Sequence, residues 1–102
     1  MRFVLVLVLT ACTTQSTGIT QSEISCDSTL TYANFGQAFM ATNCGSCHGA
    51  RTNPNLSTQA AVQSNSSRII QAAVYTTTMP ANGDLSTEER TMLGQWLSCG
   101  AP

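Results

Sequence analysis

The stretch that most constrains this chain is Cys44-Gly-Ser-Cys47-His48. Two thiols lie three residues apart, and the single histidine of the 102-residue sequence follows the second thiol directly. Three residues make about one helical turn, so both sulfur atoms face the same side of the backbone. The imidazole of the next residue then projects beside them. We therefore expect the fold to gather two thiols and one imidazole around a single ligand.

This spacing is the attachment signature of c-type haem. Two thiols add across the two vinyl groups at one edge of a porphyrin, and the attachment brings the iron to the adjacent imidazole. Cys44 and Cys47 are therefore predicted to bind one haem c covalently, with His48 as an axial ligand of the iron. A small domain with an aromatic fraction of only 6% also needs such a cofactor or crosslinks, because it buries little apolar surface alone.

Three other interpretations of the motif stay open but are less well supported. A thioredoxin-like redox pair belongs to an α/β fold, and no alternating strand pattern precedes the motif. A zinc site would lack the second close pair that is typical of zinc proteins. A plain disulfide within the motif would leave the histidine without a role. The ligands of such a zinc site would come from Cys26, Cys44, Cys47, Cys99 and His48.

The second axial ligand is assigned by elimination. The sequence holds no second histidine and no lysine, which leaves methionine as the natural choice. Met1 belongs to the leader, Met40 lies on the segment that enters the attachment turn, and Met92 belongs to an apolar helix face. Met79 lies in an irregular loop that can reach the opposite face of the ring, and Pro80 stiffens this loop. Met79 is therefore the predicted ligand, with an open sixth position as the alternative.

A His/Met ligand set favours one-electron transfer. The thioether favours ferrous iron and raises the reduction potential. With both axial positions filled, a substrate cannot reach the iron, and no second histidine is available as a distal base. We therefore expect an electron carrier rather than an enzyme, with no small-molecule substrate.

The charged residues exclude nucleic acid as a partner. Only 9% of the residues are charged, and the four basic residues are all arginine. Phosphate contacts need clustered positive charge, and the arginines are scattered along the sequence. The expected partners are redox proteins.

The first residues are typical of an exported bacterial lipoprotein. Arg2 precedes an apolar run from Phe3 to Leu9 that is too short for a membrane span, which needs about 20 residues, and that fits a secretory signal. Leu9-Thr-Ala-Cys12 resembles the lipobox, so residues 1–11 are predicted to be a signal peptide and Cys12 to carry lipid. Ordinary cleaved secretion and a buried N-terminal strand are the alternatives. The lipid would anchor the protein to a membrane, facing the periplasm.

The rest of the chain is predicted to form a tether and one small all-α domain. Residues 12–25 comprise the lipidated N-terminus and a segment rich in Ser, Thr and Gln, which predicts a flexible tether. Residues 26–102 are predicted to form the domain, because apolar residues recur in them at helical spacing. The expected helices cover 31–43, 65–75 and 85–100, and 56–63 adds one turn.

The expected helices carry recognisable capping residues. Thr31 fits a helix cap, Ser86 and Glu89 have the spacing of a capping box, and Gly100 is a stop signal. Apolar side chains at helical spacing are expected to face the core. They are Tyr32, Phe35 and Phe39; Ile69, Ile70, Ala73 and Val74; and Met92, Leu93, Trp96 and Leu97.

Residues 26–102 resemble class I cytochrome c, in particular the small bacterial monohaem proteins. The most specific match is Cys44-Gly-Ser-Cys47-His48-Gly49, and Met79-Pro80 is similar to the distal ligand and its following proline. Asn53-Pro54-Asn55-Leu56 is similar to the family's Gly-Pro-x-Leu segment, with asparagine in place of glycine. The resemblance implies a cytochrome c fold of three to four helices wrapped around one covalently bound haem.

The resemblance also implies roles for residues outside the attachment motif. The Pro54 carbonyl would accept a hydrogen bond from His48 Nδ1, and Leu56 would pack on the haem. The first and last helices would cross with Gly36 against Trp96.

That crossing would bring Cys26 and Cys99 together as a disulfide. Arg51 and Arg68 are candidates for contact with the haem propionates.

The resemblance thus implies a monohaem carrier of single electrons between membrane or periplasmic redox partners. Its docking surface would be the haem edge near the two thiols and the uncharged loop from Thr76 to Asn82. The alternatives are a haem-based sensor or ligand-binding module, in which a gas displaces Met79, and a haem subunit of a larger oxidoreductase complex.

Overall fold

The computed structural model describes residues 15–102 except 46, 50–52 and 82–84. The described residues form helices and no strand, apart from an isolated bridge between Ser16 and Thr76, so the predicted all-α class is confirmed. None of these helices is long and apolar enough to span a bilayer. In chain order they are η1 (Gln21–Glu23), η2 (Tyr32–Gly36), α1 (Gln37–Asn43), α2 (Gln59–Ser64), α3 (Ser66–Ile69), η3 (Ile70–Tyr75) and α4 (Thr87–Ser98).

The first helix is built from η2 and α1, which follow each other without a break. Its predicted cap is confirmed: Thr31 Oγ1 accepts from the Asn34 N–H at 3.1 Å, and the Asn34 side chain accepts from the Thr31 N–H at 2.8 Å. The aromatic side chains of this helix face α4. The Phe35 ring lies 5.9 Å from the Trp96 ring, centroid to centroid.

The last helix, α4, begins at the predicted capping box, with reciprocal hydrogen bonds between Ser86 and Glu89. The predicted apolar face is correct for three residues and wrong for Met92, which is 40% exposed. The buried face differs from the predicted one because it includes Arg90 and Gly94 in place of Met92. Leu93, Trp96 and Leu97 fill the rest of this face.

The two outer helices cross where Gly36 meets Trp96, as the resemblance implied. A Cβ atom on Gly36 would overlap the indole ring, and this ring is completely buried. The chain end closes over the crossing, since the Pro102 carbonyl accepts from Trp96 Nε1 and from the Tyr32 N–H. A disulfide joins Cys26 to Cys99 beside it, with their Cα atoms 4.8 Å apart.

The segment before the first helix lies along the domain, whereas the sequence predicted a flexible tether over 12–25. The Thr77 N–H donates to the Gln15 carbonyl at 2.9 Å, and the Thr17 N–H donates to the Tyr75 carbonyl at 3.0 Å. Ile19 is buried, and Ile24 packs on α4 at Gly94. The two isoleucines therefore supply apolar contacts that the polar composition concealed. Residues 1–14, including the predicted signal peptide and Cys12, lie outside the described residues.

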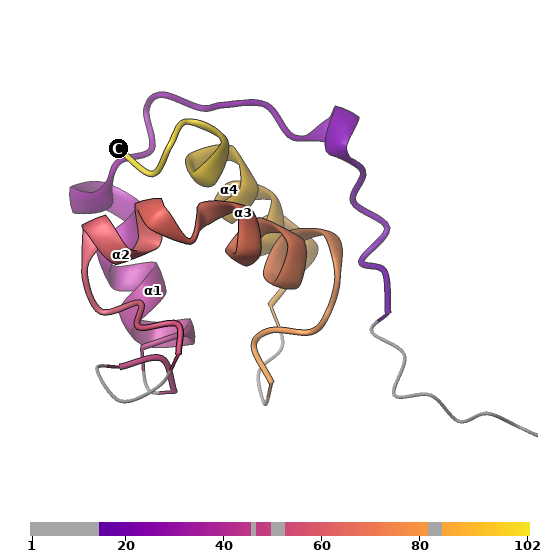
Figure 1. The fold of residues 1–102 in the computed structure, drawn as a ribbon. Helices are drawn as coiled ribbons and strands as arrows, with labels where there is room; N and C mark the ends of the chain where they lie inside the picture. The colour runs from indigo at the N-terminus through magenta and orange to yellow at the C-terminus, as the bar shows by residue number, and fades with distance from the viewer. Residues whose placement is uncertain (1–14, 46, 50–52, 82–84) are drawn as a thin grey trace, which may run out of the picture.

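Two loops project from the same side of the helical layer (Figure 1). One connects α1 to α2 and contains the attachment motif, and the other connects η3 to α4 and contains Met79. The helices α2, α3 and η3 connect the two loops. The fold thus presents both sets of predicted haem ligands on one side of the molecule.

Candidate functional site

The attachment motif forms a tight turn at the end of α1. The N–H groups of Cys47 and His48 donate to the Cys44 carbonyl at 3.2 and 2.8 Å, which extends the helical path by one turn. All three residues line one cavity. The local geometry therefore gathers the two thiols and the imidazole, as the spacing predicted.

The imidazole of His48 is oriented by the loop that follows it. His48 Nδ1 lies 2.9 Å from the Pro54 carbonyl oxygen. A carbonyl oxygen only accepts, so Nδ1 carries the proton, and in the neutral tautomer with that proton Nε2 has a lone pair for a metal. The Leu56 N–H donates to the His48 carbonyl at 2.8 Å, which holds the loop against the motif.

The cavity between the two projecting loops has a volume of about 620 Å³, within the range of small-molecule sites. Its lining is mostly apolar, and it includes both the attachment motif from the first loop and Met79 from the second. The apolar and small lining residues include Pro54, Leu56, Ile69, Ala72, Ala73 and Pro80. Two thiols, one oriented imidazole and a thioether around an apolar cavity are the donor set that suits a porphyrin and its iron.

Among the described methionines, Met79 alone lines this cavity. Met40 is 3% exposed and belongs to the core, and Met92 lies at the surface of α4. The structure therefore supports the elimination made from the sequence.

The thioredoxin-like and zinc interpretations are disfavoured by the state of the cysteines. Burial raises the pKa of the Cys44 thiol to about 11, whereas reactive redox cysteines have lowered pKa values. Cys26 and Cys99 are consumed by their disulfide and are not available to zinc. Within the described part of the chain, no three His, Cys, Asp or Glu side chains gather as a metal site.

Of the two arginines considered for contact with the haem propionates, the structure describes Arg68. Arg68 is exposed and lines the cavity, and its Nη1 lies 3.3 Å from Asn65 Oδ1. Arg51 lies outside the described residues. Arg68 thus remains a candidate for contact with a haem propionate.

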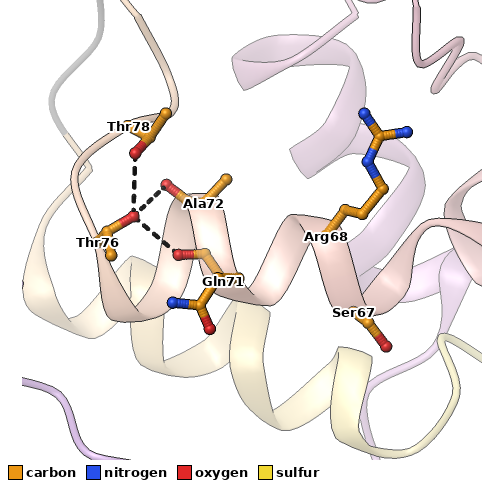
Figure 2. Close-up of a pocket in the computed structure, with 6 residues that line it drawn as sticks. All are labelled: Ser67, Arg68, Gln71, Ala72, Thr76 and Thr78. Atoms are coloured by element: carbon orange, nitrogen blue, oxygen red, sulfur yellow. Dashed lines mark hydrogen bonds between the residues drawn. The ribbon is translucent and has the colours of Figure 1, made fainter. Parts of the chain in front are cut away.

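A second, more open hollow of about 630 Å³ adjoins the cavity across the helix α3–η3. Figure 2 shows its lining: Arg68 extends from the helix, and Thr76 and Thr78 lie at the opposite end. Arg68, Ala72 and Thr78 are shared with the main cavity. Among the described residues that line this hollow, Arg68 is the one charged side chain.

Sequence reasoning missed Arg90, which lies under the Met79 loop. It is 5% exposed, and its Nη1 donates to the carbonyl oxygens of Ala73 at 2.7 Å and Met79 at 3.0 Å. The signal was its spacing: residues 90, 93, 94 and 97 form one face of a helix. No role was predicted for this arginine from the sequence, although its position on that face is a core position.

A comparison with known protein families matches residues 33–97, more than half of the chain, to the family described as "Cytochrome C oxidase, cbb3-type, subunit III". No curated protein and no solved structure matches the chain. The matched residues include the attachment motif, the cavity and most of α4.

Proposed function

The chain belongs to this family of c-type cytochrome domains, and from that premise we propose that it is a monohaem carrier of single electrons with His/Met-ligated iron. The family implies haem c as the cofactor and electron transfer as its role. When bound, the haem supplies one-electron chemistry through the ferric and ferrous states of its iron. The residues around the cavity then determine how it is held.

Each predicted site residue has a separate role in the proposal. Cys44 and Cys47 hold the haem through thioether bonds. His48 and Met79 would bind the iron, and the Pro54 carbonyl would keep the His48 ring in the orientation and tautomer that iron binding requires. Leu56 is buried at the cavity wall and excludes water from the ring.

The observation that carries the proposal is the composition of one cavity. It brings the two thiols, the oriented imidazole and a single described methionine together from two separate loops. A carrier needs both axial positions filled, and this arrangement offers one ligand from each loop.

Covalent attachment can be tested on protein produced with the haem-attachment machinery. The wild-type protein should keep its haem on a denaturing gel and through acid extraction, and its oxidised form should show the long-wavelength absorption band that the cytochrome family shows for a methionine–iron bond. The double variant Cys44→Ala, Cys47→Ala should lose the haem under both treatments. An exported wild-type protein that emerges colourless would contradict the proposal.

We further propose that the carrier is a lipoprotein anchored through Cys12 on the periplasmic side of a bacterial membrane. The support is the sequence pattern of residues 1–12. Metabolic labelling with a radioactive fatty acid should label the wild-type protein and spare Cys12→Ser. A label that persists in the variant would contradict the anchor.

A second candidate function is that of a haem subunit in a larger oxidase. The description of the matched family favours it, because that family is named for a subunit of cytochrome c oxidase. Gentle solubilisation of native membranes should distinguish the two: a subunit would migrate with a large complex, and a separate carrier would migrate as a single small protein.

A further inference from the structure

We propose that Arg90 is a positioning residue for Met79, which it holds so that the thioether can bind the haem iron. The inference rests on the ligand set proposed above and extends it to α4, whose residues take no part in the attachment motif. Arg90 is almost completely buried, and its guanidinium lies beneath the loop that carries Met79. The geometry of that loop carries the argument.

Both backbone polar groups of Met79 are bonded to neighbouring elements. Its N–H donates to the Ala72 carbonyl at 2.9 Å, and its carbonyl oxygen accepts from Arg90 Nη1 at 3.0 Å. The next residue, Pro80, has a φ restricted by its ring. The backbone of Met79 is therefore held from two sides, and the side-chain torsions are its main remaining freedom.

The same guanidinium nitrogen also bonds the end of the preceding helix. Arg90 Nη1 lies 2.7 Å from the Ala73 carbonyl oxygen and 3.4 Å from that of Thr76. The last carbonyls of a helix have no partner within it and carry partial negative charge. Arg90 therefore ties the C-terminal end of η3 directly to Met79.

A second set of bonds holds the loop from its outer surface. Thr76 Oγ1 donates to the Gln71 carbonyl at 2.8 Å and lies 3.2 Å from Thr78 Oγ1 (Figure 2). These bonds fold residues 76–78 onto the helix end but do not include Met79. The inner contact with Arg90 is the side-chain hydrogen bond that reaches Met79 itself.

The chemistry of the guanidinium explains why its loss would weaken the binding of Met79 to the iron. A buried charge is tolerated only when it is hydrogen-bonded, and bonds from a charged donor are stronger than neutral ones. Removing the side chain leaves the Met79 carbonyl without this donor. We expect the equilibrium between bound and released Met79 to shift toward release by about tenfold or more, the usual effect of losing such a bond.

The test compares wild-type haem protein with Arg90→Met, Arg90→Lys and Leu93→Ala. Leu93 lies on the same buried face of α4 and does not line the cavity, so its truncation destabilises the fold without removing a bond to Met79. Three quantities are measured for each protein: the denaturant midpoint, the pH at which the oxidised form loses its methionine–iron band, and the affinity of the reduced form for CO.

Arg90→Met should lose the band at a pH lower by about one unit or more and should bind CO at least about tenfold more tightly. Arg90→Lys should give values of both quantities between those of wild type and Arg90→Met. Its ammonium group can donate to only some of the carbonyl oxygens that Arg90 contacts. Leu93→Ala should lower the denaturant midpoint and leave the other two quantities near wild type. If Arg90→Met does not accumulate as folded haem protein, Arg90→Lys decides by the same criteria.

The inference would be overturned if the Arg90 variants lost the band at the wild-type pH and bound CO with wild-type affinity. It would also be overturned if Leu93→Ala changed these two quantities as much as the Arg90 variants do. A wild-type protein that lacks the band would overturn the assignment of Met79 as ligand, and the role of Arg90 with it. The failure of the ligand set is thus distinguished from the failure of the positioning role by the wild-type spectrum alone.

Discussion

Trp96 lies so close to Gly36 that no side-chain carbon fits between the two helices that carry them. The indole ring is fully buried, and the Phe35 ring meets it edge-on. This crossing joins the first and last helices of the domain, and the attachment turn begins at the far end of the first helix. The position of the attachment motif relative to α4 therefore depends on the absence of a side chain at Gly36.

Gly36→Ala should destabilise the haem protein by about 1–3 kcal/mol, because the new methyl group overpacks the crossing. Helix propensity alone predicts the opposite sign, a gain of about 1 kcal/mol. Guanidinium unfolding followed by tryptophan fluorescence measures the difference. The control is Ala38→Gly at an exposed position of α1, which should lose only the propensity contribution. A Gly36→Ala protein more stable than wild type would show that the crossing is looser than described.

The disulfide between Cys26 and Cys99 should be present in the exported protein. Alkylation of the unreduced native protein, followed by mass spectrometry, should find no modified cysteine at either position. Replacing both with serine should lower the free energy of unfolding by about 4 kcal/mol, since the bond closes a loop with a sequence separation of 73. Two alkylated thiols in the native protein would refute the pairing.

Met79→Leu should open the sixth coordination position while keeping a side chain of similar size. We expect loss of the methionine–iron band, a lower reduction potential and rapid binding of CO by the reduced form. Met92→Leu is the matched control, because that side chain lies at the surface of α4 and should leave all three properties unchanged. If the wild-type reduced protein binds CO as readily as Met79→Leu, the sensor interpretation gains over the carrier.

Electron exchange at the Met79 loop should depend weakly on salt. Among the described residues that line the cavity, Arg68 is the one charged side chain, and the loop from 76 to 81 carries none. Oxidation rates with an anionic and with a cationic inorganic complex can be followed by stopped flow. Between low and physiological ionic strength we expect each rate to change by less than about threefold. A tenfold fall with either complex would point to a charged docking surface.

The parts of the fold that were predicted correctly are those encoded by neighbouring residues. The caps at Thr31 and Ser86 depend on residues three positions apart, and the attachment turn depends on a spacing within five residues. Met79 was selected as the proposed ligand because few other ligands exist in the sequence, and the structure places it at the cavity. The Pro54 contact and the pairing of Cys26 with Cys99 came from the resemblance, because residue spacing alone does not determine either of them.

The parts that were not predicted depend on partners that only the folded chain brings together. Arg90 is buried because carbonyls from η3 and the Met79 loop converge on it, and no local pattern shows such a convergence. Ile19 is buried because the N-terminal segment meets the backbone after η3. Met92 was placed on the core face because hydrophobic pattern alone ignores an arginine that occupies the neighbouring core position.

If Cys12 carries the proposed lipid, the docked N-terminal segment would limit how far the haem domain can move from the membrane. The Gln15 carbonyl is bonded to Thr77, two residues from Met79, and Cys12 precedes Gln15 by three positions. Three residues span at most about 11 Å, so a lipid on Cys12 would moor the haem domain next to the bilayer surface. A Gly/Ser insert that lengthens the segment between Cys12 and Gln15 should then alter the rate of electron exchange with an integral membrane protein far more than the rate with a soluble oxidant. Electrons would then pass between proteins in the same membrane. The short distance from Cys12 to Gln15 would prevent the lipidated carrier from shuttling across the compartment.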